Sequence, residues 1–186
     1  MHTQTADAAA APPGPHEHRF GPCGRALHAA SKVLAALGGL AFVALVAMSL
    51  VSIVGRKLAA MPVPGDMEVL MMVAAAASAA FFAFCHLEGG DVKVDFFTAH
   101  AGPRVVHGLD ALGSLLVGLF GALIAWRTGV GAAALREAGE TSAILGWPVW
   151  VAQAAMVPGF VLMAAAGFYM CALHLRAARG SGEDRP

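Results

Sequence analysis

The sequence predicts an all-α integral membrane protein with four transmembrane helices, a short interfacial segment between the second and third helices, and a disordered N-terminal tail. The first observation is composition: 58% of the residues are hydrophobic and 13% are charged, which is too apolar for an ordinary soluble domain. The second is that four apolar stretches are each long enough to cross a hydrocarbon core of about 30 Å. The third is that the charged residues lie between or at the ends of these stretches and not in their middles.

The first 30 residues are rich in alanine, proline, glycine and histidine, as in ADAAAAPPGPHEH. Such a segment cannot bury enough apolar surface to fold, so we expect residues 1–30 to form a disordered tail. The first apolar run begins only after Lys32, too far from the start for a signal peptide, and should be retained. Residues 31–178 then form the four-helix domain, and residues 179–186 form a second tail.

The first two expected spans are residues 33–54 and 67–87. The first contains no charge, and at a rise of about 1.5 Å per residue it reaches about 33 Å. In the second, Glu68 stands in the first turn, where a carboxylate meets the positive end of the helix dipole. Both stretches therefore predict transmembrane helices.

The third and fourth expected spans are residues 105–127 and 148–175. Pro148 suits the first turn of a helix because its missing N–H has no partner there. Pro158 removes a backbone donor inside the fourth span and Gly159 follows it, so we expect a kink at this point.

The connection after the second span, HLEGGDVKVDFF (residues 86–97), is charged although it lies between two apolar runs. A charge inside the bilayer costs about 2.5–3.5 kcal/mol, so these residues must end the helix at the surface. Gly89 is expected to stop it. The following residues, with Lys93 and Asp95 in water and two phenylalanines in the headgroup region, predict a short interfacial segment that a partner subunit or anionic lipid could contact.

Four spans place both termini on the same side of the membrane, and the distribution of lysine and arginine indicates which side. With the termini inside, the cytoplasmic basic residues are Arg19, Arg25, Lys32, Lys93, Arg104, Arg176, Arg179 and Arg185. The external ones are Arg56, Lys57, Arg127 and Arg136. More basic residues lie on the side of the termini than on the other side, and this favours cytoplasmic termini.

Small residues at four-residue spacing predict close helix packing. Ser114 and Gly118 are so placed on the third helix, and Ala155 and Gly159 on the fourth. We expect at least half of these faces only to hold the four helices together. If the chain has more small-residue faces than its own four helices require, the surplus would indicate a larger partner.

No sequence motif indicates an enzyme, a metal site or a cofactor. There is no phosphate-binding loop and no serine, cysteine or threonine in the context of an activated nucleophile. The chain is neutral, with 12 basic and 12 acidic residues, so nothing suggests nucleic acid as a partner.

The sequence leaves two other functions open. The first is a membrane haem protein or electron-transfer anchor, because four histidines lie near the cytoplasmic helix ends. They are His28, His86, His107 and His174. The second is a self-contained exporter that works as a homo-oligomer. Both are weakened by the absence of acids or histidines from the middle of the spans, where ion and proton pathways usually place them.

Several segments resemble, in order, the small membrane subunit (DctQ type) of tripartite ATP-independent periplasmic (TRAP) transporters. They are Arg56 after the first helix, PVPGDMEV before the second, GGDVKVDFF after it, and GWPVWVAQAAMVPGF in the fourth. The resemblance covers about residues 33–175. Asp91 stands where the family commonly has a histidine.

The resemblance implies a non-catalytic scaffold in the bacterial inner membrane, with both termini cytoplasmic. It also implies a large membrane subunit as partner, and a periplasmic substrate-binding protein that delivers an organic acid or similar anion for uptake driven by an ion gradient. Arg56 and Glu68 match basic and acidic positions of the family, and we expect them to pair across the first external loop.

Overall fold

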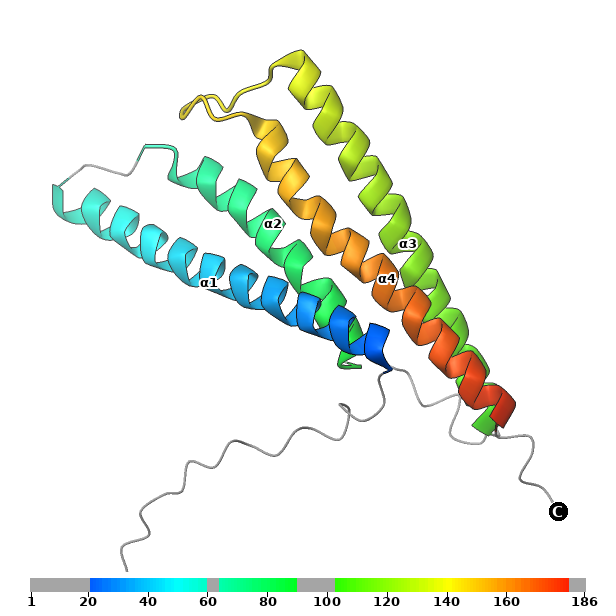
Figure 1. Cartoon of the computed structure of the whole chain (residues 1–186). Helices are drawn as coiled ribbons and strands as arrows, with labels where there is room; N and C mark the ends of the chain where they lie inside the picture. The colour runs from blue at the N-terminus through cyan, green and yellow to red at the C-terminus, as the bar shows by residue number, and fades with distance from the viewer. Residues whose placement is uncertain (1–20, 60–63, 90–102, 181–186) are drawn as a thin grey trace, which may run out of the picture.

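The computed structural model describes residues 21–59, 64–89 and 103–180, and these residues form four long helices (Figure 1). The helices are α1 (Pro22–Ala59), α2 (Asp66–Leu87), α3 (Pro103–Ala138) and α4 (Val149–Gly180). All four are long and apolar enough to cross a membrane, which confirms the predicted fold class. The expected interfacial segment with Lys93 and Asp95, residues 1–20 of the expected tail, and residues 181–186 lie outside the described residues.

The helices lie side by side in the order α1, α2, α4, α3 (Figure 1). α1 packs mainly on α2, α2 also packs on α4, and α3 packs most extensively on α4. We call the end where α1 begins and α4 finishes the terminal end, and the opposite end the loop end. Figure 1 shows the helices fanning out toward the loop end, where α1 diverges from α2 and α3 diverges from α4. The chain is therefore an open row of helices in which α1 and α3 are the edges.

α1 begins earlier than predicted. We expected a disordered tail to residue 30, but residues 22–30 belong to this helix, which is 38 residues long. Pro22 suits a first helical turn, and contacts with α4 stabilise the extension. The backbone N–H of Gly21 donates to the hydroxyl of Tyr169 at 3.2 Å, and Gly24 has no side chain to displace the Tyr169 ring. At about 1.5 Å per residue α1 is about 57 Å long, so it extends beyond a hydrocarbon core of about 30 Å.

α3 and α4 also exceed the predicted spans. α3 continues past residue 127 to Ala138, because the residues after Arg127 include a run of alanines and a leucine that favour helix in water as well as in lipid. α4 starts directly after Pro148 and continues to Gly180, so the first two residues of the expected tail at 179–186 are helical. Hydropathy marks where a helix crosses lipid, not where it ends.

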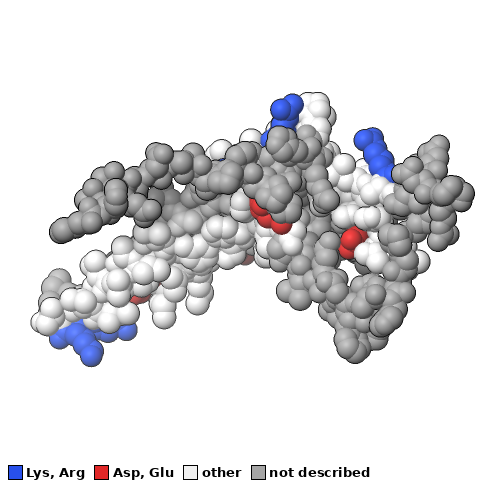
Figure 2. Space-filling view, turned by 90° about the horizontal axis from the view of Figure 1, so that it is seen from below, with Lys and Arg blue, Asp and Glu red and all other residues white. Residues whose placement is uncertain are grey.

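In this chain small residues are buried and large apolar residues are exposed, which is the reverse of the pattern in a soluble protein. The buried residues of α2 are mostly small, with Ala79 1% and Ala83 0% exposed, whereas Leu40 on α1 is 68% exposed. Lipid is as apolar as leucine, so large side chains can face outward and small ones permit helix contact. Figure 2, seen from below, shows α1 as a largely uncharged arm with basic side chains at its tip, where Arg56 and Lys57 occupy the last turn. This distribution fits a multi-pass membrane protein.

Candidate functional site

A close helix crossing joins α3 to α4 through glycines. An added Cβ on Gly118 would lie 3.1 Å from the backbone nitrogen of Phe168. One on Gly167 would overlap the backbone of Gly118 and lie 2.8 Å from the carbonyl oxygen of Ser114. Ser114 itself is 6% exposed. The predicted small-residue face of α3 thus lies against α4 of the same chain.

α2 makes similar contacts on both of its sides. Gly159 of α4 lies against the carbonyl oxygen of Ala79, and its added Cβ would be 3.1 Å from the Ala79 side chain. On the other side, an added Cβ on Gly38 of α1 would be 2.9 Å from the carbonyl oxygen of Ala77. Gly159 therefore packs against α2 of the same chain, whereas Ala155, one turn earlier on α4, is exposed.

At the loop end, Asp66 joins α2 to α1. Its Oδ2 accepts a hydrogen bond from the Ser52 hydroxyl at 2.5 Å and lies 3.5 Å from the Arg56 guanidinium. Its Oδ1 accepts from the backbone N–H of Met67 at 2.8 Å. A carboxylate at this position also faces the positive end of the α2 dipole. Asp66 thus fixes the beginning of α2 against the last turns of α1.

Glu68 instead joins α2 to the α3–α4 connection. Its two carboxylate oxygens accept hydrogen bonds from the backbone N–H groups of Ile144 at 2.9 Å and Leu145 at 3.2 Å. Gly65, with a φ of 75° that disfavours other residues, lies under the Leu145 side chain, which a Cβ there would meet at 2.5 Å. Together these contacts hold the connection over the start of α2.

The expected pair between Arg56 and Glu68 is therefore wrong: the structure pairs Arg56 with Asp66. Successive residues of an α-helix are rotated by about 100°, so positions 66 and 68 face nearly opposite sides of α2. Asp66 faces α1 and Glu68 faces the α3–α4 connection. From the sequence we expected Glu68 to be the acidic partner of Arg56, and we did not identify Asp66 or Ser52 as part of this contact.

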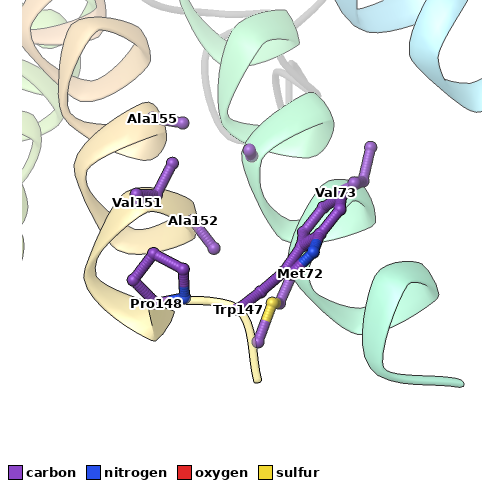
Figure 3. A pocket seen from close by; sticks show the side chains of 8 residues that line it. Met72, Val73, Trp147, Pro148, Val151, Ala152 and Ala155 are labelled. Atoms are coloured by element: carbon purple, nitrogen blue, oxygen red, sulfur yellow. The ribbon is translucent and has the colours of Figure 1, made fainter. Parts of the chain in front are cut away.

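A largely apolar groove of about 500 Å³ opens between α2 and α4 at the loop end (Figure 3). We call it the α2–α4 groove. Its lining residues are Met72, Val73, Ala76, Trp147, Pro148, Val151, Ala152 and Ala155. Trp147, 56% exposed, stands at its mouth. A groove of this size and polarity can hold apolar side chains of a second helix or part of a lipid chain.

The remaining predicted residues occupy ends or interiors of helices. Pro148 directly precedes α4 and bridges to Thr141, and Pro158 lies inside α4, which continues through it. Gly89, with a φ of 69°, follows α2 and donates its N–H to the carbonyl of His86 at 3.2 Å, as expected of a glycine that ends a helix.

The four histidines noted in the sequence do not form one group. His28 of α1 contacts Glu88 at 2.6 Å, and His86 is 5% exposed. His107 and His174, by contrast, come together from α3 and α4, with ring centroids 6.4 Å apart. Sequence reasoning missed this pairing, although both residues had been assigned to the same end of the molecule.

Comparison with known families supports the resemblance noted in the sequence. A family model described as "Tripartite ATP-independent periplasmic transporters, DctQ component" matches residues 45–177, more than half of the chain. Neither a curated protein nor a solved structure gave a match. The matched region includes α2, α3 and most of α4, together with both loop-end contacts of Asp66 and Glu68. The chain belongs to the DctQ family of small, non-catalytic membrane components of TRAP transporters.

Proposed function

We propose that this chain is the scaffold for a large membrane subunit, with which it forms an inner-membrane transporter. The complex takes up an organic acid or a similar anion, driven by an ion gradient, after a periplasmic binding protein delivers the substrate. In this arrangement the large subunit binds the substrate and the coupling ion. The single observation that carries the scaffold role is the open row of helices with an apolar groove at its loop end.

The distribution of charge supports a transport path in another chain. No Asp, Glu, Lys or Arg occurs between Lys32 and Arg56 in α1, after Glu68 in α2, or between Asp110 and Arg127 in α3. Groups that bind ions inside a membrane are commonly acids, and they face a cavity or another helix. A chain without them is suited to supporting a conducting partner.

The α2–α4 groove is the proposed place of contact with the large subunit. Small residues from both walls line it, Ala76 on α2 and Ala152 and Ala155 on α4, and small residues permit close approach of a further helix. The Glu68 contacts hold Trp147 and the rest of the α3–α4 connection at its edge. The groove is thus preformed, which lowers the ordering cost of binding.

For orientation, we propose that the terminal end is cytoplasmic and the loop end periplasmic. The excess of basic residues near the terminal end supports this, since cytoplasmic segments retain Lys and Arg. The loop end would then face the compartment in which the binding protein works. On the cytoplasmic side, we propose that a partner subunit or anionic lipid contacts Lys93, which lies outside the described residues.

The groove can be tested by filling it. Ala155→Trp adds a large side chain to the groove, whereas Ala44→Trp adds the same side chain to an exposed position of α1. Each variant is used as bait in mild-detergent affinity purification from native membranes. We expect Ala155→Trp to recover much less of the large subunit and Ala44→Trp to recover as much as the unaltered chain. Equal recovery by both variants would remove the groove from the interface.

The two other functions make different predictions for the purified chain. A haem protein would show a Soret band, and a self-contained exporter would transport when reconstituted without other subunits. The scaffold proposal predicts neither result.

A further inference from the structure

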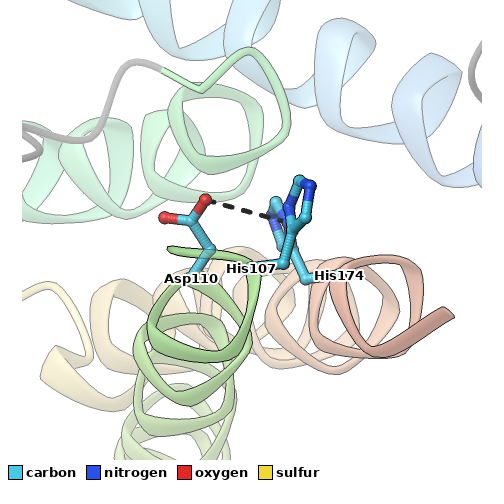
Figure 4. A group of neighbouring side chains, drawn as sticks. All are labelled: His107, Asp110 and His174. Atoms are coloured by element: carbon cyan, nitrogen blue, oxygen red, sulfur yellow. Dashed lines mark ion pairs between the residues drawn. The ribbon is translucent and has the colours of Figure 1, made fainter. Parts of the chain in front are cut away.

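Three side chains of the types that bind metal ions lie together where α3 and α4 meet at the terminal end (Figure 4). His107 and Asp110 are three residues apart on α3, so they share one face of that helix. His174 approaches them from α4. One ligand atom of each residue lies within 4.8 Å of the others. The helices therefore bring two imidazoles and one carboxylate to the same point from positions far apart in the sequence.

The cluster is partly enclosed. The His174 side chain is 18% exposed and that of Asp110 is 23% exposed, so an ion could enter from water and still be largely surrounded by protein. The Nδ1 atom of His107 is buried and has no hydrogen-bond partner. A buried polar atom without a partner is costly, and a metal ion would satisfy it.

The separation between the two helices also suits an ion. Nδ1 of His174 and Oδ2 of Asp110 are 4.0 Å apart, which is longer than a hydrogen bond of about 2.7–3.2 Å. Ligands around tetrahedral zinc, with Zn–N distances of about 2.0–2.1 Å, stand about 3.3 Å from one another. Small side-chain rotations would close the cluster to that spacing without moving either helix.

We propose that His107, Asp110 and His174 bind a divalent transition-metal ion, Zn²⁺ being the best match to two imidazoles and a carboxylate. Three protein ligands leave a fourth position for water. Because the ligands come from both helices, the bound ion links the start of α3 to the last part of α4. This site goes beyond the scaffold role and departs from the expectation, drawn from sequence, that the chain holds no metal.

The test uses the full-length chain without a polyhistidine tag, purified in mild detergent and stripped of metal by a chelator. Zn²⁺ is titrated and bound metal is measured after dialysis, and Co²⁺ serves as a coloured probe of ligand geometry. His107→Gln and His174→Gln each remove one ligand from a different helix. The sequence His16-Glu17-His18 in the N-terminal region is a competing chelator, so His16→Ala/His18→Ala is the matched control.

We expect one Zn²⁺ per chain, and the apparent affinity should fall by at least about 100-fold in either glutamine variant. The tail control should bind as the unaltered chain does. If one of the glutamine variants does not fold, as judged by its elution and helix content, the other reports on the same ion from the opposite helix. Absence of stoichiometric binding, or binding lost in the tail control and retained in the glutamine variants, would overturn the proposal.

Discussion

Replacing Gly167 with alanine should force α3 and α4 apart. The added Cβ would overlap the backbone nitrogen of Gly118, lie 2.6 Å from its Cα, and lie 2.8 Å from the carbonyl oxygen of Ser114. Carbon atoms in favourable contact are about 3.5–4.0 Å apart, so the two helices must separate locally by about 1 Å. The obstacles are backbone atoms, which cannot rotate away as a flexible side chain would.

Overpacking of this kind typically costs about 1–3 kcal/mol, equivalent to a decrease of about 5- to 150-fold in the ratio of folded to unfolded chain. Gly118→Ala should cost less, because its nearest obstacle is 3.1 Å away. Gly113→Ala on the same helix meets nothing within 4 Å and should be neutral or stabilising, because alanine favours helix over glycine by up to about 1 kcal/mol.

The assay is equilibrium unfolding of the purified chain in mixed micelles, followed by circular dichroism, with all three variants measured under the same conditions. The expected order of destabilisation is Gly167→Ala, then Gly118→Ala, then Gly113→Ala. If Gly167→Ala were as stable as Gly113→Ala, the close crossing of α3 and α4 would be refuted.

Three further predictions concern the loop end. Glu68→Gln should leave one of two backbone N–H groups without an acceptor and should speed hydrogen exchange in the α3–α4 connection, whereas Glu140→Gln, whose side chain is exposed, should not. In a double-mutant cycle for stability, Arg56→Ala should couple with Asp66→Ala but be additive with Glu68→Ala, and the reverse result would restore the pairing expected from sequence. Ser52→Ala should raise protease sensitivity between α1 and α2, because Asp66 loses its hydrogen-bond donor on α1, and unchanged cleavage would contradict that role.

The sequence predicted the number, order and approximate centres of the helices, because lipid requires long apolar stretches with satisfied backbones. It did not predict their ends. Pro22 begins α1 within the expected tail, and the contact that stabilises this extension, Tyr169 over Gly24, joins residues that are far apart in the chain. Local composition contains no information about such a contact.

The candidate site was predictable only in part. The spacing of Ser114 and Gly118 indicated a packing face, but which helix would lie against it depends on the order α1, α2, α4, α3. The same limitation explains the wrong partner for Arg56. Two acids in one helical turn differ in the direction they face, and the positions of α1 and the α3–α4 connection decide which acid meets the arginine.

The His107–Asp110–His174 cluster illustrates a third limit. The three-residue spacing of His107 and Asp110 was visible in the sequence, but His174 joins them only because α3 and α4 are antiparallel and in a particular register. Depth in the membrane could be estimated from the sequence, whereas the rotation of each helix about its axis could not.

Native mass spectrometry of the complex extracted from membranes with this chain as bait tests the scaffold proposal most directly. The account predicts a particle that contains this 19.0 kDa chain and a larger polytopic membrane protein in near-equal amounts. Recovery of this chain only, as a monomer or as a homo-oligomer, would contradict the account.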